Sequence, residues 1–82
     1  MKPQDKVTHA YVLVQIQPGK EIEFNDEILS KGLLVDPKVE RIDFVHGPFD
    51  FVIILSGPVK DIDRRIIEIR KSPSVIKTET LI

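Results

Sequence analysis

Residues 11–22 read YVLVQIQPGKEI, and the same pattern returns as FVIILSGPVKDI at residues 51–62. A valine, a proline, a lysine and an isoleucine recur at matching places, and conservative exchanges fill most of the others. Each copy begins with β-branched and aromatic residues, which favour a strand, and then reaches a proline, which fits the first turn of a helix. Acidic residues follow each proline, where the positive end of the helix dipole favours them. The chain is therefore predicted to contain one strand-helix unit twice.

A further strand follows each predicted helix. KVERIDFVH, at residues 38–46, comes after the first helix, and SVIKTETLI, at residues 74–82, comes after the second. The order β-α-β-β-α-β, joined by right-handed crossovers, favours a ferredoxin-like α+β fold. We expect a four-stranded antiparallel sheet with both helices on one face. Residues 7–82 form a single domain in this prediction, preceded by an N-terminal tail of residues 1–6.

The two predicted helices differ in the regularity of their apolar spacing. The second has one apolar stripe at helical spacing, formed by Val59, Ile62, Ile66 and Ile69. The first is less regular, with inward positions predicted at Ile22, Phe24, Ile28 and Leu29. Gly32 is well placed to follow the C-terminus of the first helix.

The strand within FDFVIIL, at residues 49–55, does not alternate apolar and polar residues. A sheet that is covered on one face only should alternate, whereas a continuous apolar run indicates burial on both faces. The two helices can cover only one face, so a second copy of the chain is expected on the other. The sequence thus predicts a homodimer that pairs sheet against sheet. The alternative is that these are scattered apolar residues tolerated on the surface.

Composition excludes several classes of protein. The 82 residues contain no Cys, 12 basic and 13 acidic residues, and no apolar run near the length of a membrane span. The chain has no basic stripe, so we expect no direct nucleic acid binding, no membrane association and a cytoplasmic location. Arg64, Arg65, Arg70 and Lys71 fall in the body and last turn of the second helix, where cations stabilise the helix dipole.

The stretch VHGPFDF, at residues 45–51, connects the second and third predicted strands. Gly47 supplies the backbone freedom of a tight turn and Pro48 restricts it. If the loop is Gly47 to Phe49, then His46 and Asp50 face each other, and Asp50 could assist His46 as a general base. Asp50 could equally hold the turn by a hydrogen bond. No other arrangement suggests catalysis, a metal site or a nucleotide site, and we expect no cofactor.

These segments resemble a known family. AYVLVQIQPG, VERIDFVHGPFDFVIIL with its G-x-F-D turn, and the closing SPSVIKTETLI are similar to the effector-binding domain, also called RAM, of the Lrp/AsnC transcription regulators. The resemblance implies a dimeric α+β barrel, further assembly into a ring of dimers, and an amino acid effector bound between neighbouring dimers. Carried over by position, the ligand-binding residues are Gly47, Pro48, Phe49, Asp50, Thr78 and Thr80. Full-length regulators of this family also carry a helix-turn-helix domain before this one. Because only a few residues precede the first predicted strand here, we expect a stand-alone form of the effector-binding domain.

Three functions remain open at this point. The resemblance favours a non-enzymatic, amino-acid-responsive module that acts by ligand-linked oligomerisation or by co-assembly with a full-length Lrp/AsnC regulator. A small enzyme of the dimeric α+β barrel type, using His46 and Asp50, is the second possibility. A purely structural assembly domain is the third. The identity of the effector and the size of the ring are not encoded in any motif.

Overall fold

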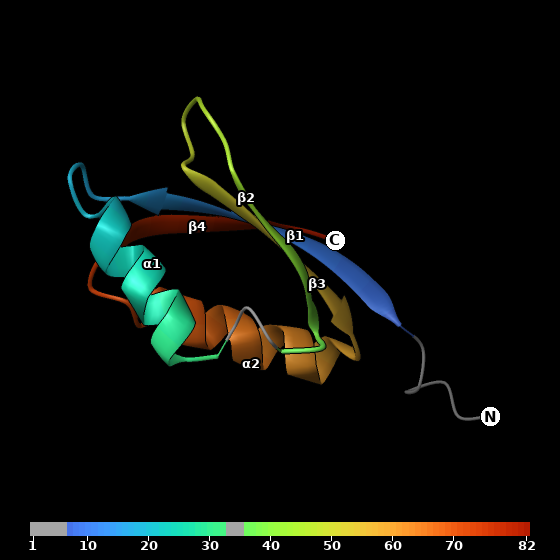
Figure 1. Cartoon of the computed structure of the whole chain (residues 1–82). Helices are drawn as coiled ribbons and strands as arrows, with labels where there is room; N and C mark the ends of the chain where they lie inside the picture. Colours follow the sequence, from blue (N-terminus) through green and yellow to red (C-terminus); the bar gives the residue numbers. More distant parts are fainter. Residues whose placement is uncertain (1–6, 33–35) are drawn as a thin grey trace.

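The computed structural model describes residues 7–32 and 36–82, and it has the predicted order of elements (Figure 1). The elements are β1 (Thr8–Ile16), α1 (Glu21–Ser30), β2 (Val39–Phe44), β3 (Phe51–Gly57), α2 (Val59–Arg70) and β4 (Val75–Leu81). The predicted N-terminal tail of residues 1–6 lies outside the described residues. The ferredoxin-like α+β prediction is confirmed.

The strands form one antiparallel sheet in the order β2-β3-β1-β4. The two strands of the sequence repeat, β1 and β3, lie at its centre and pair from Thr8 opposite Gly57 to Val14 opposite Phe51. They take the central places because they are the most apolar, and the more polar β2 and β4 form the edges. Both helices lie on the same face of the sheet (Figure 1).

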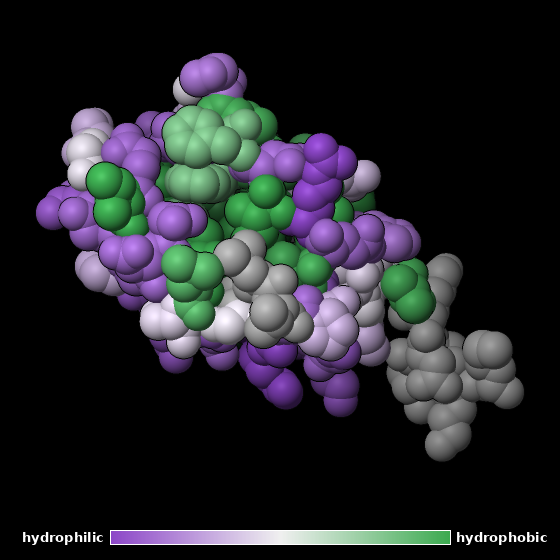
Figure 2. Space-filling view, viewed as in Figure 1, coloured by the Kyte–Doolittle hydropathy of each residue, from purple (hydrophilic) through white to green (hydrophobic). Residues whose placement is uncertain are grey.

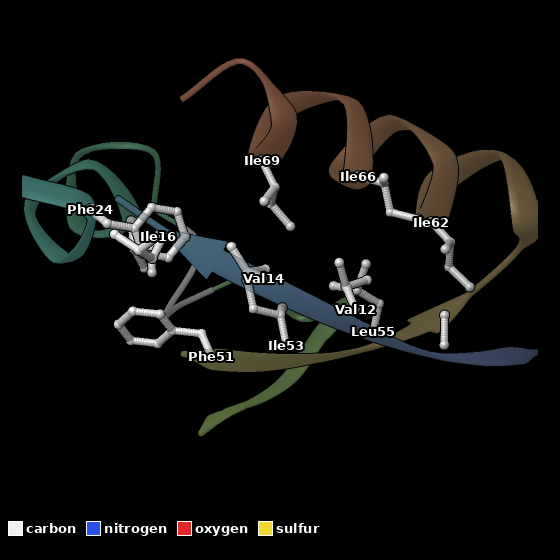
Figure 3. Close-up of a cluster of buried hydrophobic side chains, with 12 residues drawn as sticks. Val12, Val14, Ile16, Phe24, Phe51, Ile53, Leu55, Ile62, Ile66 and Ile69 are labelled. Carbon is white, nitrogen blue, oxygen red and sulfur yellow. The ribbon is translucent and has the colours of Figure 1, made fainter. Parts of the chain in front are cut away.

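The core lies between the helices and one face of the central strands. Figure 3 shows the isoleucines of α2 directed toward β1 and β3, with Phe24 of α1 beside Ile16 and Phe51. The core residues are apolar and almost fully shielded from solvent: Ala10, Val12, Val14, Ile16, Phe24, Ile28, Phe51, Ile53, Leu55, Ile62, Ile66 and Ile69. The alternate residues of β1 and β3 therefore point away from the helices, as a pleated strand requires.

Three predicted inward positions on the helices are wrong. Ile22 is 75% exposed and Leu29 is 54% exposed, and Val59, the first residue of α2, is also exposed. The reason is helical geometry: Phe24 and Ile28, four residues apart, already occupy the one face of α1 that meets the sheet. Ile22 is two residues from Phe24 and so points to a different side. Gly32 follows α1 with φ of +69°, as predicted for a helix C-terminus.

An ion pair holds the start of β2 against α2. The backbone N–H of Lys38 donates to Asp36 Oδ1 at 2.9 Å, and Arg65 Nε donates to Asp36 Oδ2. The Lys38 hydrogen bond, supported by the Arg65 guanidinium, lowers the pKa of Asp36 although partial burial opposes the shift. Because the folded pKa lies below the unfolded one, this stabilisation is present above the unfolded value and is lost as pH falls through the folded pKa.

We expect Asp36→Asn to lower the free energy of unfolding at pH 7 by about 1–2 kcal/mol, since the charge-assisted bond is lost while the amide oxygen can still accept from Lys38. The difference between wild type and variant should begin to shrink below about pH 4, where the carboxylate of the unfolded chain becomes protonated, and should vanish only below the lowered pKa of the folded state. Urea denaturation at pH 7 and pH 3 measures both differences. An equal difference at both pH values would contradict this assignment.

Candidate functional site

The β2–β3 hairpin contains the turn that the sequence marks as a binding candidate. The N–H of Val45 donates to the carbonyl oxygen of Asp50 at 2.9 Å, so the loop runs from His46 to Phe49. The loop is one residue longer than the version that would place His46 opposite Asp50. His46 instead approaches the ring of Phe44, with 6.2 Å between ring centroids. The sequence left the register of this hairpin open, and the structure does not have the register that would pair His46 with Asp50.

The tip of this hairpin depends on Gly47. Its φ of +123° is a value that side-chain-bearing residues rarely adopt, although a Cβ built there would meet no neighbouring atom. The prediction that Gly47 supplies positive φ is confirmed. Any other residue at this position would strain the backbone without a steric clash.

Asp50 joins the hairpin to the end of β1. The N–H of Ile16 donates to Asp50 Oδ2 at 2.8 Å, and the N–H of Asp50 donates to the carbonyl oxygen of Val14 at 2.9 Å. The carboxylate therefore satisfies a backbone donor where the β1–β3 pairing ends. Only one of its two oxygens is used in this bond, and the side chain is partly exposed. Asp50 can hold the sheet and still offer an acceptor to a ligand.

The two predicted threonines lie on the opposite edge of the sheet. Thr78 pairs with Val14 and Thr80 pairs with Val12, so both hydroxyls are on the helix-covered side and are partly buried. β1 lies between β4 and the turn, and neighbouring strands are about 4.8 Å apart. One chain thus brings residues 47–50 together but does not bring the threonines to them.

A side chain of β4 contacts the turn. The Lys77 ammonium lies 5.9 Å from the centroid of the Phe49 ring, near the outer limit of a cation–π interaction. Lys77 is the neighbour of Thr78 in β4, on the edge of the sheet. No sequence pattern predicted this contact, because it depends on how the hairpin curves over the sheet.

Among the pockets on the described surface are two of similar volume. One, of about 220 Å³, is lined by Arg70, Val75, Ile76, Lys77 and Thr78, and so contains one of the predicted threonines. The other, of about 250 Å³, is lined by Glu21, Ile22, Asn25, Phe44 and Phe51. The predicted turn residues line neither of them.

The second pocket belongs to a partly apolar surface. Figure 2 shows hydrophobic side chains gathered among hydrophilic ones on the face that carries α1 and the β2–β3 hairpin. Ile22 and Phe44 are strongly exposed there, and the Phe44 ring packs edge-on against Phe51 at 5.1 Å between centroids.

The face of the sheet opposite the helices has an apolar centre, which we call the open face. It is formed by Tyr11, Leu13, Val52 and Ile54. Charged side chains border it on both edge strands: Arg41, Asp43, Lys77 and Glu79. An apolar centre with a charged rim is the usual composition of a protein–protein interface. β3, the strand predicted not to alternate, therefore carries apolar side chains on both sides: one set lies in the core and the other lies on the open face.

Residues 7–32 and 36–82 show neither a membrane-spanning helix nor a metal site. No helix there is long and apolar enough to cross a membrane. Nor does that part of the chain bring together three or more side chains of the types that bind metal ions.

Comparison with known proteins places this fold among transcription regulators and small related proteins. No protein-family model and no curated protein matches the chain. FFRP-DM1 is 32% identical, with a TM-score of 0.70 over 93% of this chain and 96% of that one. A hypothetical protein from Pyrococcus horikoshii is also 32% identical, with a TM-score of 0.69 over 93% of this chain and 87% of its own. An AsnC family transcriptional regulator from Agrobacterium tumefaciens shares the fold at 15% identity and a TM-score of 0.69, and this chain spans 54% of it.

Proposed function

Because this chain belongs to the Lrp/AsnC family, in which it corresponds to the RAM-like effector-binding domain, we propose that it is an amino-acid-responsive assembly module. Its ligand is a small amino acid effector, and its output is a change in oligomeric state or in co-assembly with a full-length Lrp/AsnC regulator. The proposal is supported by two separate features of the surface. One is the open face, which suits a second copy of the chain, and the other is the polar turn, where one oxygen of the Asp50 carboxylate accepts from Ile16 and the other is left for a ligand.

The turn and β4 provide complementary groups for an amino acid. The free oxygen of Asp50 can accept from an α-ammonium group, and the Thr78 hydroxyl can donate to a carboxylate. Asp50 lies directly before β3 and Thr78 lies in β4, with β1 between them. A site that uses Gly47, Pro48, Phe49, Asp50, Thr78 and Thr80 together is therefore one that neighbouring copies complete, and ligand binding would be linked to assembly.

The open face supports a homodimer as the basic unit. Two copies that pair these faces by a two-fold axis would bury Leu13, Val52 and Ile54 and leave the charged rim in water. A ring of such dimers would then bring the turn of one dimer toward β4 of another.

The alternative functions are distinguished by specific features. The enzyme hypothesis required His46 beside Asp50, but the Asp50 carboxylate is bonded to the N–H of Ile16 and His46 lies against Phe44. A purely structural assembly domain would share the open face and the same assembly, but it would bind no effector.

Thermal unfolding in the presence of each of the twenty amino acids tests the proposed function. A ligand at 100 times its Kd stabilises by about 2.7 kcal/mol, which raises Tm by about 10 °C or more in a domain of this size. We expect one or a few amino acids to produce such a shift. No shift with any of them would leave the purely structural role.

Two variants of Asp50 separate its role in the sheet from its role in binding. Asp50→Asn keeps an oxygen that can accept from Ile16 but loses the charge that attracts an ammonium group, so we expect nearly normal stability and a lost ligand shift. Asp50→Ala loses both, and we expect it to cost a further 1–2 kcal/mol, roughly, in the unliganded protein. If Asp50→Asn retains the full ligand shift, the ammonium group is bound elsewhere.

A further inference from the structure

The pocket of about 250 Å³ lies where the first turns of α1 pass the end of β2. Glu21, Ile22 and Asn25 come from α1, Phe44 ends β2 and Phe51 begins β3. Phe44 and Phe51 are opposite each other in the β2–β3 pairing, so both rings lie on the helix-covered face of the sheet, 5.1 Å apart between centroids. Two aromatic rings and an isoleucine therefore form an apolar wall beside one acid and one amide.

Helical spacing directs the polar side chains of α1 to this pocket. Glu21 and Asn25 are one turn apart, on one flank of the buried face of α1. Glu27 lies on the other flank, where its carboxylate accepts from Ser74 Oγ beside β4. Since β2 and β4 are the opposite edges of the sheet, Glu21 and Asn25 are on the side of α1 that meets Phe44.

The two polar side chains of the lining are without a partner in the described part of the chain. None of the side-chain hydrogen bonds and ion pairs there involves Glu21 or Asn25. Glu21 stabilises the positive end of the helix dipole, but Glu23 does so from outside the pocket. The dipole alone therefore does not account for an acid inside the pocket.

We propose that this pocket binds a small organic ammonium ion with an apolar body, an alkylamine or an arylamine. The Glu21 carboxylate and the side-chain carbonyl of Asn25 can each accept a hydrogen bond from the ammonium group. Ile22 and Phe44 then cover the apolar body. The volume is below the roughly 300–1,000 Å³ of pockets for drug-sized molecules, so a single ring or a short branched chain suits it.

The charge of the lining distinguishes an amine from an amino acid. It contains one acid and, among the described residues, no cation. An amino acid that placed its ammonium group on Glu21 would bring its own carboxylate close to the same acid. Neither Asp50 nor Thr78 lines this pocket, so the site is separate from the one in the proposed function and goes beyond it.

Titration with three matched ligands, followed by the NMR signals of the Ile22 and Phe44 backbone amides, tests the proposal. Phenethylamine and phenethyl alcohol share a ring and a chain length and differ in charge, and phenylalanine is phenethylamine with an added carboxylate. We expect phenethylamine to bind with a Kd of about 1 mM or lower, which a ligand of this size can reach. The alcohol and phenylalanine should bind at least about tenfold more weakly at these amides, because the alcohol lacks the charge and phenylalanine is repelled by Glu21.

Glu21→Gln should weaken binding of phenethylamine by about tenfold and change binding of the alcohol little. Glu23→Gln is the matched control, since it removes the same charge from the same turn of α1 at an exposed position outside the pocket. It should bind phenethylamine as wild type does. Equal losses in the two variants, binding of the alcohol or of phenylalanine as tight as that of phenethylamine, or no binding of the amine would each overturn the proposal. The proposed function would then stand unchanged, because it uses the turn and β4.

Discussion

Replacing Phe51 with alanine is expected to destabilise the folded chain by about 3–5 kcal/mol, the usual result for a buried phenylalanine in a packed core. Phe51 is 6% exposed and lies between the rings of Phe24 and Phe44, each 5.1 Å away between centroids. It is also the first residue of β3 and pairs with Val14 of the central strand. The substitution therefore leaves a cavity at the point where α1, the hairpin and the sheet meet.

Such a loss is a large part of the total stability of a small domain, which is about 5–15 kcal/mol. We expect Phe51→Ala to unfold at far lower urea concentration than wild type, as measured by circular dichroism. Phe44→Ala is the matched control, since Phe44 contacts the same ring but is 62% exposed. It should cost less than about 1.5 kcal/mol, because little buried area is lost. Similar losses in the two variants would mean that the aromatic contacts, and not burial, stabilise this corner.

The fold could be predicted because its determinants are local and repeated. The strand-helix pattern occurs twice, and its two strands became the central pair of the sheet. The alternating burial of β1, with Val12 and Val14 inward and Leu13 outward, also follows from strand geometry alone. The inward positions of α1 were predicted less well, because its charged residues leave no clear apolar stripe and only packing against Phe51 shows that Phe24 defines the inner face.

The candidate site depended on contacts between distant residues, and there the sequence was less informative. Asp50 was predicted to act either on His46 or within its own turn, yet its partner is the N–H of Ile16, which is 34 residues away. That bond is set by the register of β1 against β3, which no local motif specifies. Arg70 was assigned to the helix dipole, and its place in a pocket with Thr78 becomes visible only when α2 packs beside β4.

Replacing Leu13 with glutamate is expected to convert a dimer into a monomer. Leu13 lies at the middle of the open face, opposite Val52 on one side and Glu79 on the other. In a two-fold symmetric pairing of these faces, the substitution buries two carboxylates with no cationic partner at the centre of the interface. At several kcal/mol for each ion, the dimer should weaken by at least about 4 kcal/mol, or a thousandfold in Kd.

The monomer itself should tolerate this change, since the open face of an isolated chain is in contact with water and the core side of β1 is unaltered. Leu29→Glu supplies the matched control: it is the same substitution at a position on α1 that is 54% exposed and belongs to the helix layer. Analytical ultracentrifugation over a range of concentrations should show dimers or larger assemblies for wild type and Leu29→Glu, and monomers for Leu13→Glu. If Leu13→Glu stays assembled while Leu29→Glu dissociates, the chain associates through its helices and the open face is not its interface.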